Sequence, residues 1–145
     1  MPYYYSTKTM KARHAGGDYS TARGPFVEGE RMIFGKMTIP AGTRAELHSH
    51  PNEQFSYIIQ GRIRMEVAGK KRTLGPGDII HVPANTLHSA TVIGEEDHVF
   101  ITVKDSSWGI HGVKAAPGAK GGKKRAAPPR ARAKRKAPSR RRTSR

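Results

Sequence analysis

The chain has 145 residues, enough for one domain, and contains no cysteine, which excludes disulfide bonds and thiolate metal sites. Its 27 lysines and arginines outnumber its 11 aspartates and glutamates, for a formal net charge of +16. Fourteen of the basic residues and none of the acidic ones lie between Lys114 and Arg145, which leaves +2 for residues 1–113. The high isoelectric point therefore describes the C-terminal segment and not the rest of the chain.

The first 24 residues are polar and are interrupted by Gly16, Gly17 and the pair Gly24-Pro25. We expect a flexible N-terminal arm over 1–24, with room for one edge strand. This segment lacks the apolar region of a secretory signal, and no run of the chain approaches the roughly 20 apolar residues of a membrane span. Together with the missing cysteines, these features predict a cytoplasmic protein with no membrane partner.

From Phe26 onward, short runs rich in β-branched and aromatic residues alternate with turn signals such as Gly61, Gly69 and Gly94. Their spacing predicts eight strands within about eighty residues, which is typical of an all-β sandwich or barrel. The expected strands are 31–39, 43–49, 54–60, 62–68, 71–74, 78–82, 87–93 and 98–104.

The expected strand 54–60 is apolar on both faces. If Gln54, Ser56 and Ile58 face the interior, then Phe55, Tyr57 and Ile59 form a second apolar face. Water should not contact such a face, and packing against a second subunit would cover it. We therefore expect a homodimer.

The segment 113–145 is built from Lys, Arg, Ala, Pro, Gly, Ser and Thr, with Val113 as its one larger apolar residue. Such a composition cannot bury a core and predicts a disordered tail. The tail has no aromatic residue to stack on bases, so any binding to nucleic acid would be independent of sequence. A solvated extension without a partner is the alternative interpretation.

Three histidines and one glutamine are candidate metal ligands. His48 and His50 are two positions apart, so both can point to one face of a strand, and His88 can join them only through the fold. Gln54 supplies an amide oxygen. Imidazole and oxygen donors of this kind suit Fe(II), Mn(II), Ni(II), Zn(II) or Co(II), and the sequence does not choose among these divalent transition metals.

The glycines and prolines around these residues resemble the two motifs of the cupin family, over roughly residues 26–105. The first motif is Gly42, five residues, His48-Ser49-His50, three residues, Gln54, six residues and Gly61. The second is Gly77, five residues, Pro83-Ala84-Asn85, two residues and His88, followed after three residues by Val92. Compared with the family pattern, Gln54 replaces a glutamate, Asn85 a glycine and Val92 an asparagine.

The resemblance implies a double-stranded β-helix, the jelly-roll barrel of cupins, over 25–112, with an ion held inside by His48, His50, Gln54 and His88. Because Gln54 is neutral, the ligands would leave the full charge of a divalent ion uncompensated, which favours Lewis-acid chemistry. Three residues are candidates for a catalytic role. Glu46 shares the parity of His48, although a surface carboxylate is the favoured interpretation; His81 can point inward or outward; and Thr102 lies on the last strand.

The form His48-Ser49-His50-Pro51-Asn52-Glu53-Gln54 resembles small single-domain cupins that include isomerase-type enzymes acting on uronates. Those proteins carry an aspartate and an aromatic residue where this chain has Thr102 and Lys104. We therefore expect a small-molecule substrate and a metal-dependent reaction, either of isomerase or lyase type or of dioxygenase type. The alternative is a ligand-binding or sensor module, not an enzyme, that the basic tail tethers to nucleic acid.

Overall fold

The computed structural model describes residues 2–121, in which the chain forms antiparallel strands and no helix. No helix that could cross a membrane therefore occurs within this range. The strands are β1 (Arg13–His14), β2 (Arg23–Gly24), β3 (Phe26–Glu28), β4 (Met32–Ile39), β5 (Arg44–Ser49), β6 (Gln54–Gln60), β7 (Arg62–Val67), β8 (Lys70–Leu74), β9 (Ile79–Val82), β10 (His88–Ile93), β11 (His98–Asp105) and β12 (Val113–Lys114).

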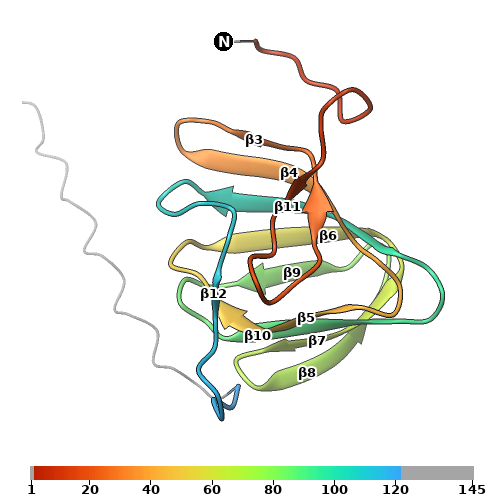
Figure 1. Ribbon diagram of the computed structural model, residues 1–145, viewed down its shortest axis with the longest axis vertical. Coiled ribbons are helices and arrows are strands. Elements are labelled where there is room, and N and C mark those ends of the chain that lie inside the picture. Colours follow the sequence, from red (N-terminus) through yellow and green to blue (C-terminus); the bar gives the residue numbers. More distant parts are fainter. Residues whose placement is uncertain (1, 122–145) are drawn as a thin grey trace, which may run out of the picture.

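Two sheets face each other as layers (Figure 1). The seven-stranded sheet has the order β1-β2-β4-β11-β6-β9, with β3 also paired to β4. The five-stranded sheet has the order β12-β5-β10-β7-β8. The central neighbours β4 and β11, β11 and β6, and β5 and β10 are far apart in sequence, as in a jelly roll. This order places β5, β6, β10 and β11 around one interior.

The eight strands expected from the sequence are β4 to β11, and the all-β double-layered fold is confirmed. Alternation explains the agreement. In β7, Arg62 and Arg64 are exposed while Ile63 and Met65 are buried, so every second side chain enters the core. The main core cluster lies between the sheets and includes Ile58 of β6.

Residues 13–24 differ from the flexible arm expected over 1–24. Tyr19 and Ala22 are buried, and β2 pairs with β4 of the larger sheet. The same segment also reaches the smaller sheet, since the backbone N–H of Glu46 donates to the carbonyl of Tyr19 over 2.8 Å. This segment therefore bridges the two sheets. Polar composition concealed its role because few of its side chains are apolar, and its backbone makes the contacts.

The C-terminal boundary also differs from the expected start of the tail at residue 113. Val113 and Lys114 form β12, which pairs with Ser49 and His48 of β5. The ammonium of Lys114 lies 2.9 Å from a carboxylate oxygen of Glu46. The barrel therefore extends beyond residue 112, and the remainder of the expected tail, 122–145, lies outside the described residues.

Gly61 joins β6 to β7 and has no room for a side chain. Its φ is +80°, in the region that favours glycine. A Cβ at this position would lie 2.5 Å from the carbonyl oxygen of Asp97. Gly42 has a similar φ of +76°, but its Cβ would meet nothing within 4 Å. A side chain at Gly42 would therefore add backbone strain alone, whereas a side chain at Gly61 would add strain and steric overlap.

We expect Gly42→Ala to lower the free energy of unfolding by about 1 kcal/mol, the cost of a left-handed conformation for alanine. Gly61→Ala should lower it by about 3 kcal/mol, because overlap with the Asp97 backbone adds to the same strain. Denaturant titration of both variants measures the difference. Equal effects would show that the backbone at Asp97 moves aside without cost.

Candidate metal centre

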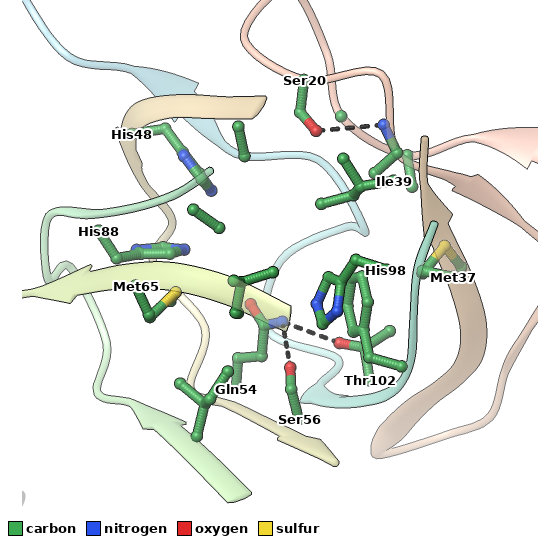
Figure 2. A pocket seen from close by; sticks show the side chains of 18 of the residues that line it. Ser20, Met37, Ile39, His48, Gln54, Ser56, Met65, His88, His98 and Thr102 are labelled. Carbon is green, nitrogen blue, oxygen red and sulfur yellow. Dashed lines mark hydrogen bonds between the residues drawn. The ribbon is translucent and has the colours of Figure 1, made fainter. Parts of the chain in front are cut away.

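Three strands bring the four expected ligands to one end of the interior. His48 is near the end of β5 and His50 just after it, Gln54 begins β6, and His88 begins β10. His48 and His88 are register partners across β5 and β10. Figure 2 shows His48 and His88 side by side at one side of the cavity, with the Gln54 side chain extending toward it from below.

A β-bulge in β5 sets the orientation of its side chains. Between the pairs His48–His88 and Ala45–Ala90, β5 has one residue more than β10. Ala45 and His48 consequently both line the cavity, although strict alternation would place them on opposite faces. Glu46 does not line the cavity and contacts Arg44 and Lys114, in agreement with the favoured interpretation of a surface carboxylate and not with the alternative of a catalytic base.

The three imidazole rings are packed together. Their centres are 4.0 Å apart for His48 and His88, 4.9 Å for His50 and His88, and 6.3 Å for His48 and His50. An ion bound to two imidazoles at about 2.1 Å holds the ring centres no more than about 6.5 Å apart. All three separations are within this limit.

Each ring is oriented by a backbone carbonyl. The Nδ1 atoms of His48, His50 and His88 lie 2.6, 2.8 and 2.8 Å from the carbonyl oxygens of Glu46, Asn52 and Thr86. A carbonyl can only accept, so Nδ1 carries the proton and Nε2 keeps its lone pair. This is the tautomer that a metal-binding histidine uses, with the second nitrogen tied to an oxygen.

Burial keeps the rings neutral. It lowers the pKa of His48 to about 4 and that of His50 to about 4, and it lowers the pKa of His88 well below its usual value. Desolvation is the largest cause in each case, because the charged form loses its hydration. At neutral pH the cluster therefore presents three uncharged nitrogen donors.

The side chains of Gln54 and His50 each direct a hydrogen-bond acceptor at the other. Oε1 of Gln54 lies 2.9 Å from Nε2 of His50, while Nε2 of Gln54 donates to the hydroxyls of Ser56 and Thr102, both over 3.0 Å (Figure 2). Since Nε2 of neutral His50 also accepts, the two lone pairs oppose each other. A shared cation removes this conflict. A half-turn of the amide removes it too, because the amide nitrogen then donates to His50 and the oxygen accepts from both hydroxyls.

The donor set fits a divalent transition ion in chemistry and in number. As the side chains lie in this structure, however, no three His, Asp or Glu groups among residues 2–121 form a group that could hold an ion. Binding would require the rings to turn about their side-chain bonds. The ring of His48 is stacked on Tyr19, with centres 3.9 Å apart, so Tyr19 limits how far His48 can turn.

The other two candidates for a catalytic role, His81 and Thr102, lie on opposite sides of the larger sheet. His81 of β9 points outward, where its ring stacks on Phe55 and its Nε2 lies 2.7 Å from a carboxylate oxygen of Glu53. Thr102 of β11 lines the cavity and holds the Gln54 amide. His98 of β11 is also buried and lines the cavity.

Sequence reasoning assigned no role to Lys104, Tyr19 or Asn52. Lys104 is buried in the cavity wall, where its Nζ donates to the carbonyl of Ile110 over 2.8 Å and burial lowers its pKa to about 8. Asn52 is buried and donates to carbonyls of the loop after β11, which positions the carbonyl that orients His50. Alternation along β11 would have found Lys104, because residues 98, 100, 102 and 104 share one face.

The cavity has a volume of about 90 Å³ and is partly open to solvent. His48 and His88 are at one side, His98 is at the other, and Gln54 extends toward the cavity from below (Figure 2). Its remaining lining is mainly apolar and includes Ile39, Ile63, Met65, Ile80 and Phe100. An apolar pocket with a few convergent polar groups is the usual form of a small-molecule site.

Residues 35–104 match the model of the Cupin domain family. Quercetin 2,3-dioxygenase of Bacillus subtilis (strain 168) is 41% identical over 51 residues, which are 34% of this chain and 15% of that enzyme. Oxalate decarboxylase OxdC of the same strain is 37% identical over 73 residues, 46% of this chain and 19% of that protein. The chain thus spans only a small part of either relative.

Solved structures show the same fold. The RmlC-like cupin from Shewanella frigidimarina NCIMB 400 superposes with a TM-score of 0.62 at 19% identity, over 72% of this chain and 91% of that chain. At this identity the likeness concerns the fold alone. With the family match and two antiparallel sheets in the expected order, it identifies residues 35–104 as a cupin domain, and the chain belongs to the cupin superfamily.

Proposed function

We propose that His48, His50, His88 and Gln54 hold one divalent transition metal ion, Fe, Mn, Ni, Zn or Co, for chemistry on a small molecule. The observation that carries the proposal is the common state of the three imidazoles. All are buried, all are uncharged at neutral pH, and all have Nδ1 tied to a carbonyl. With Nδ1 tied to a carbonyl, the Nε2 atom of each ring keeps the lone pair that a metal ion would bind.

The ligand set favours Lewis-acid chemistry of isomerase or lyase type. A bound divalent ion would polarise a substrate oxygen, and four neutral ligands would leave its full charge for that purpose. Thr102 and Ser56 would orient the Gln54 amide, and the carbonyls of Glu46, Asn52 and Thr86 would fix the imidazoles. The apolar walls would exclude water from the substrate.

Oxygen chemistry of dioxygenase type is the second candidate. The three-histidine donor set and the similarity to a quercetin dioxygenase over 51 residues favour it. Oxygen consumption by the Fe(II)-loaded protein with a simple 1,3-diketone or a catechol distinguishes the two reaction types.

The purified protein should bind about one divalent ion per chain, and His88→Ala should weaken binding by at least about 100-fold, since a ligand contributes more than the 10–100-fold of an orienting partner. Elemental analysis after dialysis and titration with each metal measure both quantities. His81→Ala is the matched control, because His81 lies on the outer surface. Failure of all five metals to bind, or unchanged affinity in His88→Ala, would contradict the proposal.

We further propose that the outer face of the seven-stranded sheet forms a homodimer. Tyr57 is 49% exposed and Ile79 is 67% exposed, and the two are register partners on β6 and β9. Phe34 and Phe55 extend the same face, since both pair with Val103 of β11. No other segment within residues 2–121 covers these side chains, and an apolar face of this extent is typical of an interface.

Light scattering at tens of micromolar should give the mass of a dimer. Tyr57→Lys should weaken the dimer by about 30-fold or more, because it places a charge at the centre of the apolar face. Trp108→Lys is the control, because Trp108 is similarly exposed, at 46%, but lies in the loop after β11. A monomeric wild-type protein would refute the homodimer.

The basic C-terminal segment supports a separate proposal, non-specific contact with nucleic acid. Such contact would also tether the protein if it is a ligand-binding or sensor module and not an enzyme. Residues 122–145 hold twelve lysines and arginines and no acidic residue. Cations on such a segment can displace counterions from a phosphate backbone.

A chain that ends at Gly121 retains β12 and should keep its melting temperature and metal content while losing most affinity for DNA. Binding by the full chain should weaken with salt by about 0.9 log units per decade for each phosphate contacted, with no preference for sequence. Filter binding at several salt concentrations measures the slope. Salt-insensitive binding by the shortened chain would contradict this proposal.

A further inference from the structure

Lys104 places a positive charge inside the cavity. Its side chain comes from β11, where it lies in register with Gln54 of β6, and only 5% of the residue is exposed. One N–H of the ammonium donates to the carbonyl of Ile110 over 2.8 Å. Within residues 2–121 this is the one hydrogen bond of that group, although an ammonium has three donors.

No carboxylate balances this charge. None of the cavity-lining side chains is acidic, and no acidic group among the described residues lies within 4 Å of the Lys104 nitrogen. Burying a cation without an anion is costly, and folded proteins usually pair such a charge or bind a counterion.

The same cavity contains a second unsatisfied group. His98 is 2% exposed and lines the cavity, and its Nδ1 has no hydrogen-bond partner. The ring is stacked on Phe100, with centres 4.7 Å apart, so it is held in place. A buried polar atom without a partner in a cavity wall indicates that a ligand or water completes it.

We propose that Lys104 binds the anionic group of the substrate and that the site takes small carboxylates with an adjacent carbonyl oxygen, such as 2-oxo acids. The inference rests on the proposed metal-dependent function, since the ion would receive the second oxygen. The cavity of about 90 Å³ is smaller than the roughly 150 Å³ that holds benzene in an engineered core, so it limits the ligand to a molecule no larger than about six heavy atoms. Lys104 would thus select for charge, and the apolar walls would limit size.

Calorimetric titration of the Zn(II)-loaded full chain with pyruvate and with uncharged pyruvamide tests this inference. The two probes have nearly the same shape, so their ratio of affinities isolates the charge. Wild-type protein should bind pyruvate at least 10-fold more tightly than pyruvamide. Lys104→Met should weaken pyruvate binding by about 10–100-fold, the range for losing a charge-assisted hydrogen bond, with little effect on pyruvamide.

Lys70→Met is the control for net charge, because Lys70 is exposed on β8. If Lys104→Met does not fold, Lys104→Gln replaces it as the test variant. The ratio of pyruvate to pyruvamide affinity in the wild-type protein also tests the inference without any variant. A wild-type ratio near one, or a ratio that Lys104→Met leaves unchanged, would overturn the role of Lys104. Repeating the titration without metal, and measuring the binding of all five metals, separates the two proposals. Discrimination by Lys104 in a protein that binds none of the five metals would contradict only the metal site. Bound zinc without discrimination would contradict only this inference.

Discussion

The pairing of β5 with β10, with one additional residue in β5, is the constraint on which the site depends. On one side of the bulge the two strands contribute Ala45 and Ala90 to the apolar core, and on the other they bring His48 against His88. Removing the additional residue would turn one of these pairs away from the interior, because successive side chains of a strand face opposite ways. A single irregularity therefore lets the same two strands build both core and site.

The charge of the cavity follows one pattern. A glutamate at position 54 would balance part of an ion's charge and would also lie beside Lys104 in register. With Gln54 in its place, neither the ion nor the lysine has an internal anion, and the imidazoles are neutral. If the cavity binds an ion, the neutral Gln54 on β6 and the buried Lys104 on β11 would leave the negative charge to be supplied by the bound small molecule.

Local patterning was enough to predict the strands. The alternation in β7 and glycines such as Gly61 placed β4 to β11 to within one residue, because a sheet with one buried face requires a period of two. The N-terminal segment was not predicted, since Tyr19 and its neighbours are held by backbone hydrogen bonds to β5 that leave no periodic trace. Neither was the bulge in β5, because a bulge depends on pairing between strands. That His48, His50, Gln54 and His88 lie near one another could be predicted, because motif spacing records fold as well as chemistry.

The two orientations available to the Gln54 amide have a consequence for how the protein matures. With its oxygen toward His50 the amide can share a cation, and after a half-turn it donates to His50 and accepts from Ser56 and Thr102. The Gln54 amide and His50 can thus satisfy each other without an ion. In small zinc domains the ion supplies the free energy of folding, and chelators unfold them. If this chain binds an ion, the barrel could fold first and bind the ion afterwards, so the supply of metal would not govern the lifetime of the protein.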